Sequence, residues 1–403
     1  MKPVETNALN GGRLKAMAAL RGVSFTCLDA TVQKSAEAPW NVDRILVEYR
    51  DYTATLRAVE LVPRTQRRYP GKPIFAIGPY AEFNAAHLQA KYGVEVVQGS
   101  PVQVLDHVFG QTLNRDKRDW PDVVPDRSDF RSLRQYPKLR MPRLANLDAF
   151  DSAGWVEKVS GNIEFSNGCL YKCLYYSVAA KYDGEQTEYP QAAILADIDQ
   201  LVAGGAEHIA ITDADAFGRP SHAIALLRLA HTKYPDLTFD AVTRVDHIRK
   251  IRNSLLELRD LGLVKLTSSF EFPDDRVLRA VNKEFAAADI PNAIRWCREA
   301  NIALAPTFIP FNPWVGATDV EELPKFLACY GLESTTDQSQ LATRLLLYKG
   351  SPLLRSPAIT TLGLKFTEQE FHVDWAHLDP RVDDLYHAAL AKCGAGGKCC
   401  IRC

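Results

Sequence analysis

Two cysteines four residues apart, Cys169 and Cys173, are the residues of this 403-residue chain whose type and spacing point most directly to chemistry. They lie within the segment 166–177, directly after an apolar run at 161–165 that is predicted to be a strand. Thiolates gathered in one short loop are the ligands that an iron–sulfur cluster requires. A loop at the carboxyl end of a strand is also where an α/β barrel keeps its reactive groups. We therefore expect this loop to hold an iron–sulfur cluster.

A second group of thiols lies at the end of the sequence. Cys399, Cys400 and Cys403 fall within five residues, and Cys393 precedes them. Neighbouring basic residues favour the thiolate form, and soft thiolates select soft metals and metalloids. Three glycines in the segment 393–403 predict a mobile tail. The alternatives are a metal or metalloid site built by these thiols and a disordered end whose thiols are unused or bind zinc.

Composition limits the function classes. The hydrophobic fraction of 46% and charged fraction of 24% are those of a globular protein, and the net charge of −1 gives no reason to expect a nucleic-acid or membrane partner. No transmembrane run or signal peptide is recognised, so we expect a cytoplasmic protein without disulfides. The isolated cysteines Cys27, Cys297 and Cys329 are predicted to be buried as small hydrophobic residues.

The first 110 residues alternate between strand-like and helix-like segments, which predicts a small, Rossmann-like parallel α/β domain. The predicted strands are 42–49, 73–80 and 94–99, and the predicted helices are 53–68 and 84–92. Residues 111–155 hold many Arg and Asp residues and several prolines without a sustained period, which predicts an exposed linker with a solvated charged face.

Strand–helix alternation returns after this linker and predicts a partial (β/α)6 barrel over residues 156–355. Its strands are predicted to end near Phe165, Thr212, Val242, Phe270, Phe308 and Leu347. A carboxyl-terminal extension, 356–403, contains a last helix with Asp379 as N-cap and Pro380 at its first position, ending near residue 391. The chain is thus predicted to be α/β, with two folded units, a linker and a cysteine-rich tail.

The cysteine loop resembles the C-x3-C-x2-C signature of the radical S-adenosylmethionine (SAM) superfamily, including the flanking S-x-G-C-x-Y-x-C. Tyr176 stands where the signature has its third cysteine. Further motifs that resemble the family's follow successive predicted strand ends over residues 40–355: T-D-A-D-A-F at 212–217, R-V-D at 244–246, F-E at 270–271 with V-L-R-A-V-N-K at 277–283, T-F-I-P-F-N-P-W at 307–314, and Y-K-G-S-P-L at 348–353.

The resemblance implies a [4Fe–4S] cluster, SAM as co-substrate, and a pocket for SAM at the carboxyl ends of the strands. The residues it places there are Cys169, Cys173 and Tyr176 at the cluster, and Asp213, Asp215, Arg244, Glu271 and Thr307 around SAM. For a charged residue such as Arg244, a structural salt bridge stays an alternative to a ligand contact. The resemblance also implies a small-molecule substrate and an electron donor such as flavodoxin or ferredoxin, which allows a C–S bond of SAM to break.

Tyr176 leaves three alternatives open for the cluster. In the first alternative, a tyrosinate ligates iron, because a bound metal lowers the pKa of a phenol. Alternatively, a tail cysteine supplies the third thiolate. In the third alternative the site is impaired, by natural drift or by a deliberate Cys-to-Tyr change.

The amino-terminal domain resembles the cobalamin-binding domain that precedes such barrels. It lacks the D-x-H-x-x-G motif that supplies an axial histidine, and neither His87 nor His107 has that sequence context. We expect a domain that keeps the architecture without the corrin, while corrin binding without a histidine ligand stays the alternative.

The tail, Lys398–Cys403, resembles the R-C-C-L-K-C ending of radical SAM proteins of arsinothricin biosynthesis. That resemblance implies a transferase that moves the 3-amino-3-carboxypropyl group of SAM to trivalent arsenic, with arsenite held by Cys399, Cys400 and Cys403. The alternatives are a cobalamin-dependent radical SAM methyltransferase or ring-forming enzyme, and a catalytically impaired, thiol-rich protein that binds a metal or metalloid.

Overall fold

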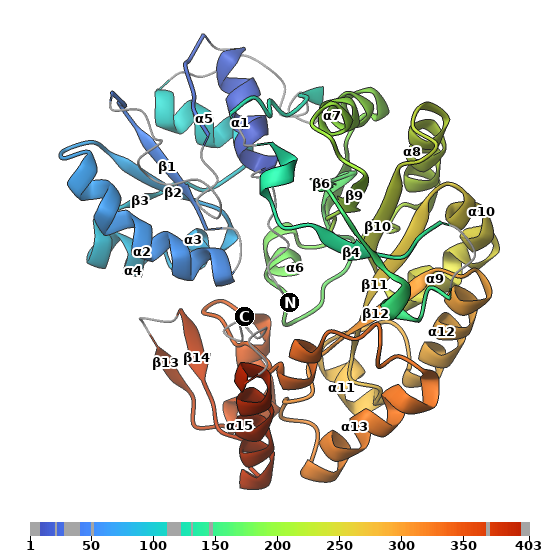
Figure 1. The fold of residues 1–403 in the computed structure, drawn as a ribbon. Coiled ribbons are helices and arrows are strands. Elements are labelled where there is room, and N and C mark those ends of the chain that lie inside the picture. The colour runs from blue at the N-terminus through green and yellow to red at the C-terminus, as the bar shows by residue number, and fades with distance from the viewer. Residues whose placement is uncertain are drawn as a thin grey trace.

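The computed structural model describes residues 9–20, 22–27, 41–49, 52–110, 122–129, 132–144, 148–367 and 371–395. Two parallel sheets organise this part of the chain, a three-stranded sheet near the amino terminus and a five-stranded sheet in the middle segment. Helices connect successive strands of both sheets (Figure 1). The predicted α/β class is therefore confirmed.

The amino-terminal sheet is parallel and has the strand order β1-β2-β3. Its strands are β1 (Ile45–Glu48), β2 (Ile74–Ile77) and β3 (Glu95–Val96). Strand β2 is buried on both faces, because Ala76 contributes to one apolar cluster while Phe75 and Ile77 contribute to another. Side chains alternate between the two faces of a strand, so helices must cover both sides of this sheet.

Helices do cover both faces of the amino-terminal sheet. One face packs on α2 (Tyr52–Arg68), α3 (Pro79–Phe83) and α4 (Ala85–Tyr92), and the other packs on α1 (Leu9–Ala19) and α5 (Pro101–Phe109). Every strand and helix predicted for residues 42–99 is present, and the strands are shorter than predicted.

The five-stranded sheet is the wall of the barrel and has the order β12-β11-β10-β9-β6, with every neighbouring pair parallel. Its strands are β6 (Ser160–Ile163), β9 (His208–Ile211), β10 (Thr238–Thr243), β11 (Leu263–Glu271) and β12 (Ala303–Phe308). Each of these strands lies beside the one that precedes it in the chain. Their carboxyl ends therefore meet at a single edge.

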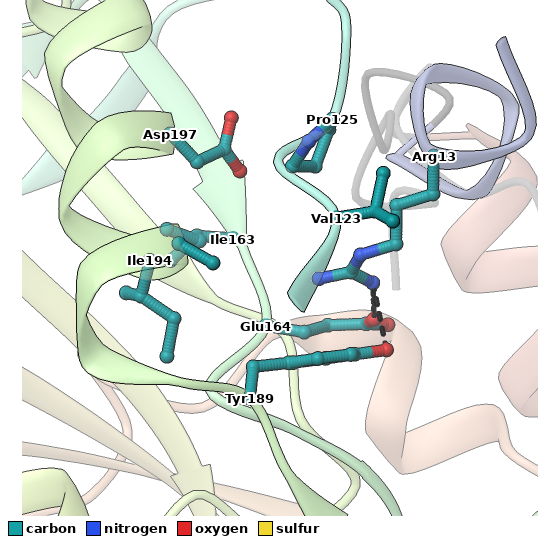
Figure 2. A pocket seen from close by; sticks show the side chains of 9 residues that line it. Arg13, Val123, Pro125, Ile163, Glu164, Tyr189, Ile194 and Asp197 are labelled. Atoms are coloured by element: carbon teal, nitrogen blue, oxygen red, sulfur yellow. Dashed lines mark hydrogen bonds and ion pairs between the residues drawn. The ribbon is translucent and has the colours of Figure 1, made fainter. Parts of the chain in front are cut away.

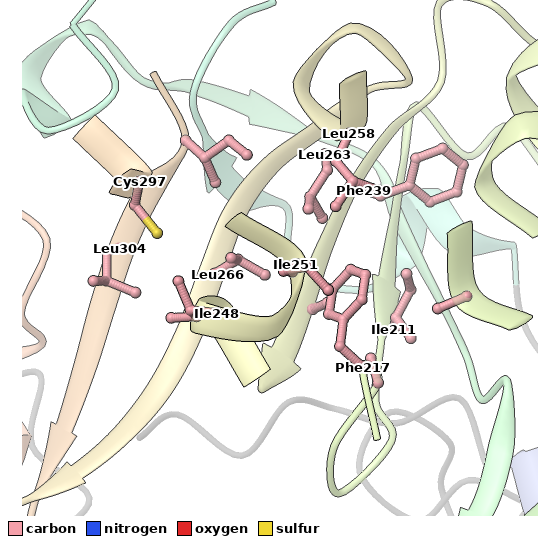
Figure 3. Packing of buried hydrophobic residues seen from close by; sticks show 14 of the residues in the cluster. Ile211, Phe217, Phe239, Ile248, Ile251, Leu258, Leu263, Leu266, Cys297 and Leu304 are labelled. Carbon is pink, nitrogen blue, oxygen red and sulfur yellow. The ribbon is translucent and has the colours of Figure 1, made fainter. Parts of the chain in front are cut away.

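Helices pack on the outer face of this wall, where Phe239, Leu266 and Leu304 belong to one apolar cluster with the helix residues Ile248 and Leu258 (Figure 3). The helices of this region are α6 (Ser177–Tyr182), α7 (Gln191–Ala203), α8 (Pro220–Lys233), α9 (Val245–Ile251), α10 (Leu255–Asp260), α11 (Asp275–Ala280), α12 (Ile290–Glu299) and α13 (Ala317–Tyr330). Along β10, β11 and β12, buried residues alternate with partly accessible ones, so the inner face of the wall is the more open face.

The three isolated cysteines differ in burial. Cys297 belongs to the barrel core and Cys27 is also buried, as predicted. The prediction is wrong for Cys329, which is exposed because it lies on the outward side of α13.

The sixth predicted strand, ending near Leu347, is reduced to isolated bridges. Phe311 bridges Arg344 in the parallel sense, and the Leu345 N–H donates to the Phe311 carbonyl at 2.8 Å. Leu347 instead bridges Val373 in the antiparallel sense. This segment leaves the wall because its backbone pairs with the carboxyl-terminal hairpin.

The described part of the region 111–155 contacts both units: Val123 packs on the amino-terminal unit, whereas Arg127 reaches the barrel. Strand β4 (Leu139–Met141) pairs with β5 (Val156–Lys158) in an antiparallel hairpin. Arg127 donates to both oxygens of the buried Asp197 carboxylate, at 2.5 and 2.8 Å. The predicted solvated face is therefore wrong at Arg127, because the buried Asp197 charge requires a partner.

The amino-terminal unit contacts the barrel through α3, which packs against α6. Lys181 Nζ lies 2.8 Å from Glu82 Oε1 across this contact. The Tyr348 ring lies 5.6 Å from the Tyr80 ring and 5.1 Å from the Phe83 ring, measured between centroids. Residues from beyond the barrel strands thus complete the apolar core of the amino-terminal unit.

Arg13 on α1 makes a second contact between the two units (Figure 2). Its Nη1 donates to Glu164 Oε2 at 2.9 Å and to the Tyr189 hydroxyl at 2.8 Å, and its guanidinium lies 3.7 Å from the centroid of the Tyr189 ring. A cavity of about 10 Å³ lies beside it, between Val123 and Asp197. This volume suits about one water molecule.

The carboxyl-terminal region contains α14 (Pro357–Thr360), an antiparallel hairpin of β13 (Lys365–Thr367) and β14 (His372–Asp374), and α15 (Pro380–Ala395). The Asp379 carboxylate accepts the Arg381 N–H at 3.1 Å, which confirms the predicted N-cap. Helix α15 runs beyond its predicted end, so Cys393 is helical rather than part of a mobile tail. No helix in the described ranges is long and apolar enough to cross a membrane.

Candidate active site

The loop with Cys169 and Cys173, together with α6, is an excursion between two paired strands, β7 (Ser166–Gly168) and β8 (Gln186–Glu188). Gly168 has φ +91°, and a Cβ at this position would lie 2.2 Å from the Glu185 carbonyl oxygen. The Cys169 N–H donates to the same oxygen at 3.0 Å. Only glycine suits this turn, which places the first thiol at the carboxyl end of the barrel wall.

Both thiols of the loop are buried, with 6% and 7% of their surface exposed. Burial raises the pKa of the Cys169 thiol to about 11. The loop is held from the opposite side by the turn after α11: the Leu174 N–H donates to the Val281 carbonyl, and Asn282 Nδ2 donates to the Lys172 carbonyl at 2.9 Å. The V-L-R-A-V-N-K stretch found in the sequence therefore supports the cysteine loop directly.

Tyr176 lies on the same loop, at the N-cap of α6, with 38% of its surface exposed. Its backbone N–H donates to the Cys173 carbonyl at 3.4 Å, and its ring lies 6.3 Å from that of Tyr175. Cys393, at the end of α15, lies with its Sγ 3.6 Å from the Gln338 carbonyl oxygen. The three predicted arsenic-binding residues lie outside the described residues: Cys399, Cys400 and Cys403.

Asp213 and Asp215 follow β9 and are both buried. Asp213 accepts the Phe165 N–H at 2.8 Å and the Ser166 hydroxyl at 2.5 Å. Burial raises the pKa of the Asp213 carboxyl to about 7. Asp215 accepts the Thr243 hydroxyl at 2.9 Å. Both carboxylates bond to protein groups behind the cysteine loop, and their predicted contact with SAM stays a prediction.

Arg244 lies directly behind Cys173 and is 4% exposed. Its Nη1 lies 3.5 Å from Cys173 Sγ, and its Nε donates to Asp246 Oδ1 at 2.9 Å. Its guanidinium lies 3.5 Å from the centroid of the Tyr171 ring. The Nη2 atom is buried and has no hydrogen-bond partner within the described part of the chain. Both roles weighed for Arg244 thus have support, a salt bridge with Asp246 and a free donor for a ligand.

Glu271 ends β11 with φ +57°, a left-handed conformation that is uncommon outside glycine. Its Oε1 accepts from Lys283 Nζ at 2.7 Å and from the Tyr175 hydroxyl at 2.5 Å. Burial lowers and the Glu271 carboxylate raises the pKa of Lys283, with a net increase. A buried ion pair therefore lies beside the second cysteine, and Tyr175 of the loop bonds to its carboxylate.

Thr307 lies on β12, opposite Ser269 of β11 in the sheet register. Both side chains are partly accessible, whereas the neighbouring Phe308 is packed in the core under the helices. Alternation along the strands therefore directs both hydroxyls to the inner face of the wall. This is the face on which a small molecule in front of the cysteine loop would lie.

Five residues of this site had no role in the sequence-based prediction: Tyr171, Tyr175, Asp246, His247 and Lys283. Tyr171, Asp246 and Lys283 stand at defined positions of motifs quoted above, so a signal was present for these three, whereas Tyr175 occupies an unspecified position of the cysteine signature. His247 follows the R-V-D motif directly and had no signal of its own. Its place in the site depends on the turn from β10 into α9, which the sequence pattern does not resolve.

The donor set fits a [4Fe–4S] cluster at two of three positions. Two buried thiols on one loop, beside the Arg244 cation, suit a cluster with thiolate ligands. The next position of the signature carries the Tyr176 phenol. Across the described ranges, no group of three or more His, Cys, Asp or Glu side chains is arranged to hold a metal ion.

The amino-terminal unit offers no histidine poised as an axial ligand for a corrin in its described part, 41–110. The His87 ring packs edge-on against Phe371, at 5.4 Å between centroids. His107 Nε2 lies 2.6 Å from Glu95 Oε1 at the surface. The residues present do not fit a histidine-ligated corrin.

Comparison with known proteins agrees with this geometry. The sequence profile of the radical SAM superfamily matches residues 163–326, which contain the cysteine loop and the wall from β9 to β12. No curated protein matches the chain.

Two solved structures share the fold over most of the chain. One is TsrM, a radical SAM methyltransferase from Kitasatospora setae with tryptophan substrate and aza-SAM bound; it is 16% identical, with a TM-score of 0.60 over 87% of this chain and 72% of TsrM. The other is OxsB, a cobalamin-dependent SAM radical enzyme with aqua-cobalamin bound; it is 12% identical, with a TM-score of 0.69 over 96% of this chain and 64% of OxsB. Residues 163–326 of this α/β chain therefore match the radical SAM superfamily in sequence, and the chain shares its fold with cobalamin-dependent radical SAM proteins.

Proposed function

We propose that this protein is an enzyme that cleaves SAM at an iron–sulfur cluster held by its cysteine loop. The observation that carries the proposal is a pair of buried thiols, Cys169 and Cys173, at the carboxyl edge of five parallel strands inside the radical SAM domain. A bound [4Fe–4S] cluster would supply the electron that breaks a C–S bond of SAM.

The protein's own side chains would bind and orient the cluster and SAM. Cys169 and Cys173 would hold the iron, and Asp213 fixes the backbone from which their loop departs. The buried, unpartnered Nη2 of Arg244 supports a hydrogen bond to a carboxylate such as that of SAM. The hydroxyl of Thr307 supports a polar contact on the inner face of the wall.

We propose trivalent arsenic as the acceptor, with transfer of the 3-amino-3-carboxypropyl group of SAM. The support is the tail sequence, in which Cys399, Cys400 and Cys403 provide three thiolates for a thiophilic, pyramidal As(III) centre. The C–S bond to that group would break with an electron pair leaving on the sulfur of methylthioadenosine, and a C–As bond would form at the expense of the arsenic lone pair, which takes As(III) to As(V). The electron that the cluster would supply to open the C–S bond would return to the cluster.

The test is anaerobic reconstitution with iron and sulfide, followed by incubation with SAM, dithionite and arsenite. We expect methylthioadenosine and an organoarsenical in equal amounts. A variant with Cys399, Cys400 and Cys403 changed to serine should lose the organoarsenical, whereas the matched control Cys393→Ser should keep it. Finding neither 5′-deoxyadenosine, methylthioadenosine nor an organoarsenical would refute SAM cleavage altogether.

A second candidate is a cobalamin-dependent methyltransferase or ring-forming enzyme. The likeness to TsrM and OxsB along most of the chain favours it, whereas the surroundings of His87 and His107 do not. Protein produced with cobalamin would carry bound corrin, visible by its colour, only under this candidate. A thiol-rich protein that binds metal or metalloid without catalysis would show neither corrin nor the broad absorbance of a cluster.

The role of Tyr176 is tested by Tyr176→Cys. Iron content and SAM cleavage are compared between this variant and the wild type. A large gain in iron content and in SAM cleavage would show that Tyr176 is a defect, because the wild type then lacks a ligand at this position. No gain, or a decrease, identifies the tyrosine as part of a working site.

A further inference from the structure

The cation nearest the cysteine loop contacts a thiol rather than only a carboxylate. Arg244 Nη1 lies 3.5 Å from Cys173 Sγ, within the range of an N–H···S hydrogen bond. The side chain is 5% exposed, so bulk water does not screen this contact. Arginine keeps its charge under all ordinary conditions, so the bond is charge-assisted whenever the sulfur is a thiolate.

Two contacts fix the guanidinium in this position. Asp246 Oδ1 accepts from Arg244 Nε at 2.9 Å, and the Tyr171 ring covers the face of the guanidinium at 3.5 Å. Tyr171 lies between the two cysteines in the loop, so the stacking joins Arg244 to the loop itself. A side chain held at its edge and its face loses little further freedom when it donates to sulfur.

A second layer of buried groups holds Tyr171. Its hydroxyl lies 2.6 Å from His247 Nε2 and 3.1 Å from Asp246 Oδ2. His247 is fully buried, and its Nδ1 lies 2.6 Å from Asp215 Oδ2. A continuous set of contacts thus runs from the end of β9 to the second cysteine.

The set of contacts that ends at Arg244 is larger than anchoring the loop alone requires. Residues that only stabilise a loop do not need a cation directed at sulfur, because a buried cation has a large desolvation cost. A donor to a ligand sulfur, in contrast, changes the electron density that the sulfur gives to iron, and such bonds are among the determinants of cluster potential.

We propose that Arg244 is a positioning residue that donates to the Cys173 thiolate in the cluster-loaded protein and thereby raises the reduction potential of the cluster. This inference rests on the proposed function, since it presupposes a cluster on the loop. The bond withdraws electron density from sulfur, so the reduced cluster gains more from it than the oxidised cluster. Tyr171, His247, Asp246 and Asp215 hold the donor in place.

The experiment is a redox titration of reconstituted wild type, Arg244→Gln and Arg244→Lys, followed by electron paramagnetic resonance, with iron content and thermal unfolding measured in parallel. Arg249→Gln is the matched control, because Arg249 is half exposed on α9, the helix that follows Arg244 directly, and pairs with Asp289. At a fixed ambient potential we expect Arg244→Gln to hold wild-type iron with about a tenfold lower ratio of reduced to oxidised cluster, a shift of about 59 mV to more negative potential for a one-electron couple. Arg244→Lys should lie between the two, and the control should match the wild type.

Wild-type potentials in both Arg244 variants at full iron content would overturn the inference and leave SAM cleavage intact. Loss of iron from both variants while they stay folded would overturn it too, because Arg244 would then be required for assembly instead of modulating an assembled cluster. If Arg244→Gln does not fold, the Lys variant decides by the same criteria. A wild-type protein without iron would instead refute the proposed function.

Discussion

The two parallel sheets of this protein end in different environments. At the carboxyl edge of the barrel wall lie buried charged groups, each with a partner of opposite charge or several hydrogen-bond donors: Asp213, Asp215, Arg244, Glu271 and Lys283. At the carboxyl edge of the amino-terminal sheet, Tyr49, Tyr80 and Phe83 gather instead, and Tyr348 from beyond the barrel packs on them.

The difference indicates where the molecule retains chemistry. Burying ionised groups is costly, and such groups are found together mainly where a function requires them. An aromatic edge gains free energy from burial alone and needs no ligand. The barrel edge therefore supports the proposed reaction, and the amino-terminal edge packs against the barrel.

The largest effect is expected from Cys173→Ala. Removing one of two thiols of the loop should abolish iron incorporation and SAM cleavage, because one thiolate cannot hold a cluster. The matched control is Cys297→Ala, which removes an equally buried thiol from the barrel core and should lower stability while keeping the iron. Iron quantification and visible absorbance after reconstitution decide this. Equal iron in both variants would remove the basis for a cluster on this loop.

Breaking the buried ion pair at the barrel edge should have the next largest effect. Glu271→Gln leaves Lys283 buried without its counter-charge and should lower the free energy of unfolding by about 3–5 kcal/mol. The matched variant Glu82→Gln breaks a more accessible pair with Lys181, between the two units, and should cost about 1 kcal/mol or less. Denaturant unfolding measures both, and similar costs would contradict the contrast between the two regions.

The pH dependence of stability should reveal Asp213. Its carboxyl has a pKa of about 7 in the folded protein against an ordinary value of 3.8, because of its burial. Between about pH 4 and 7 the folded state keeps a proton that the unfolded state has released, so stability falls as pH rises, by at most about 4 kcal/mol, and levels off above pH 7. Asp213→Asn should flatten this fall, and the exposed-site control Asp199→Asn should keep it. An unchanged slope in Asp213→Asn would assign the fall to other groups.

The fold was predictable where local pattern and tertiary pairing agree. Strand β2 was predicted from a continuous apolar run that ends at a Gly-Pro pair. The structure has a strand within that run and a helix that begins at the proline. The sixth barrel strand was not predictable, because Leu347 has the composition of a strand residue but pairs with Val373 of a hairpin far along the chain. The burial of Arg127 was not predictable for a similar reason, because no residue near it in sequence shows that Asp197 is its partner.

The site was predictable at the residues that define motifs and less so at those that support them. Cys169 was named from its spacing, Asp213 and Arg244 were named from the resemblance to family motifs, and the structure brings all three to one edge. His247 was missed because its role depends on contacts with Tyr171 and Asp215, which lie far from it in sequence. A motif identifies groups that meet a ligand, whereas the groups behind them follow only from three-dimensional contacts.

The smallest expected effect comes from removing one hydroxyl oxygen at each of the two edges. Tyr171→Phe, at the barrel edge, removes a hydroxyl that contacts His247 and Asp246 and should cost about 1–2 kcal/mol of unfolding free energy. Tyr49→Phe, at the amino-terminal edge, removes a buried hydroxyl that has no hydrogen-bond partner within the described ranges and should leave stability unchanged or raise it by up to about 1 kcal/mol.

Both substitutions keep the ring, so thermal or denaturant unfolding of the pair isolates what each hydroxyl does. A loss in Tyr49→Phe as large as that in Tyr171→Phe would show that the amino-terminal edge also uses its polar atoms. Opposite signs would instead show that only the barrel edge stabilises its buried hydroxyl with hydrogen bonds, because an unpaired buried hydroxyl costs free energy that its removal recovers.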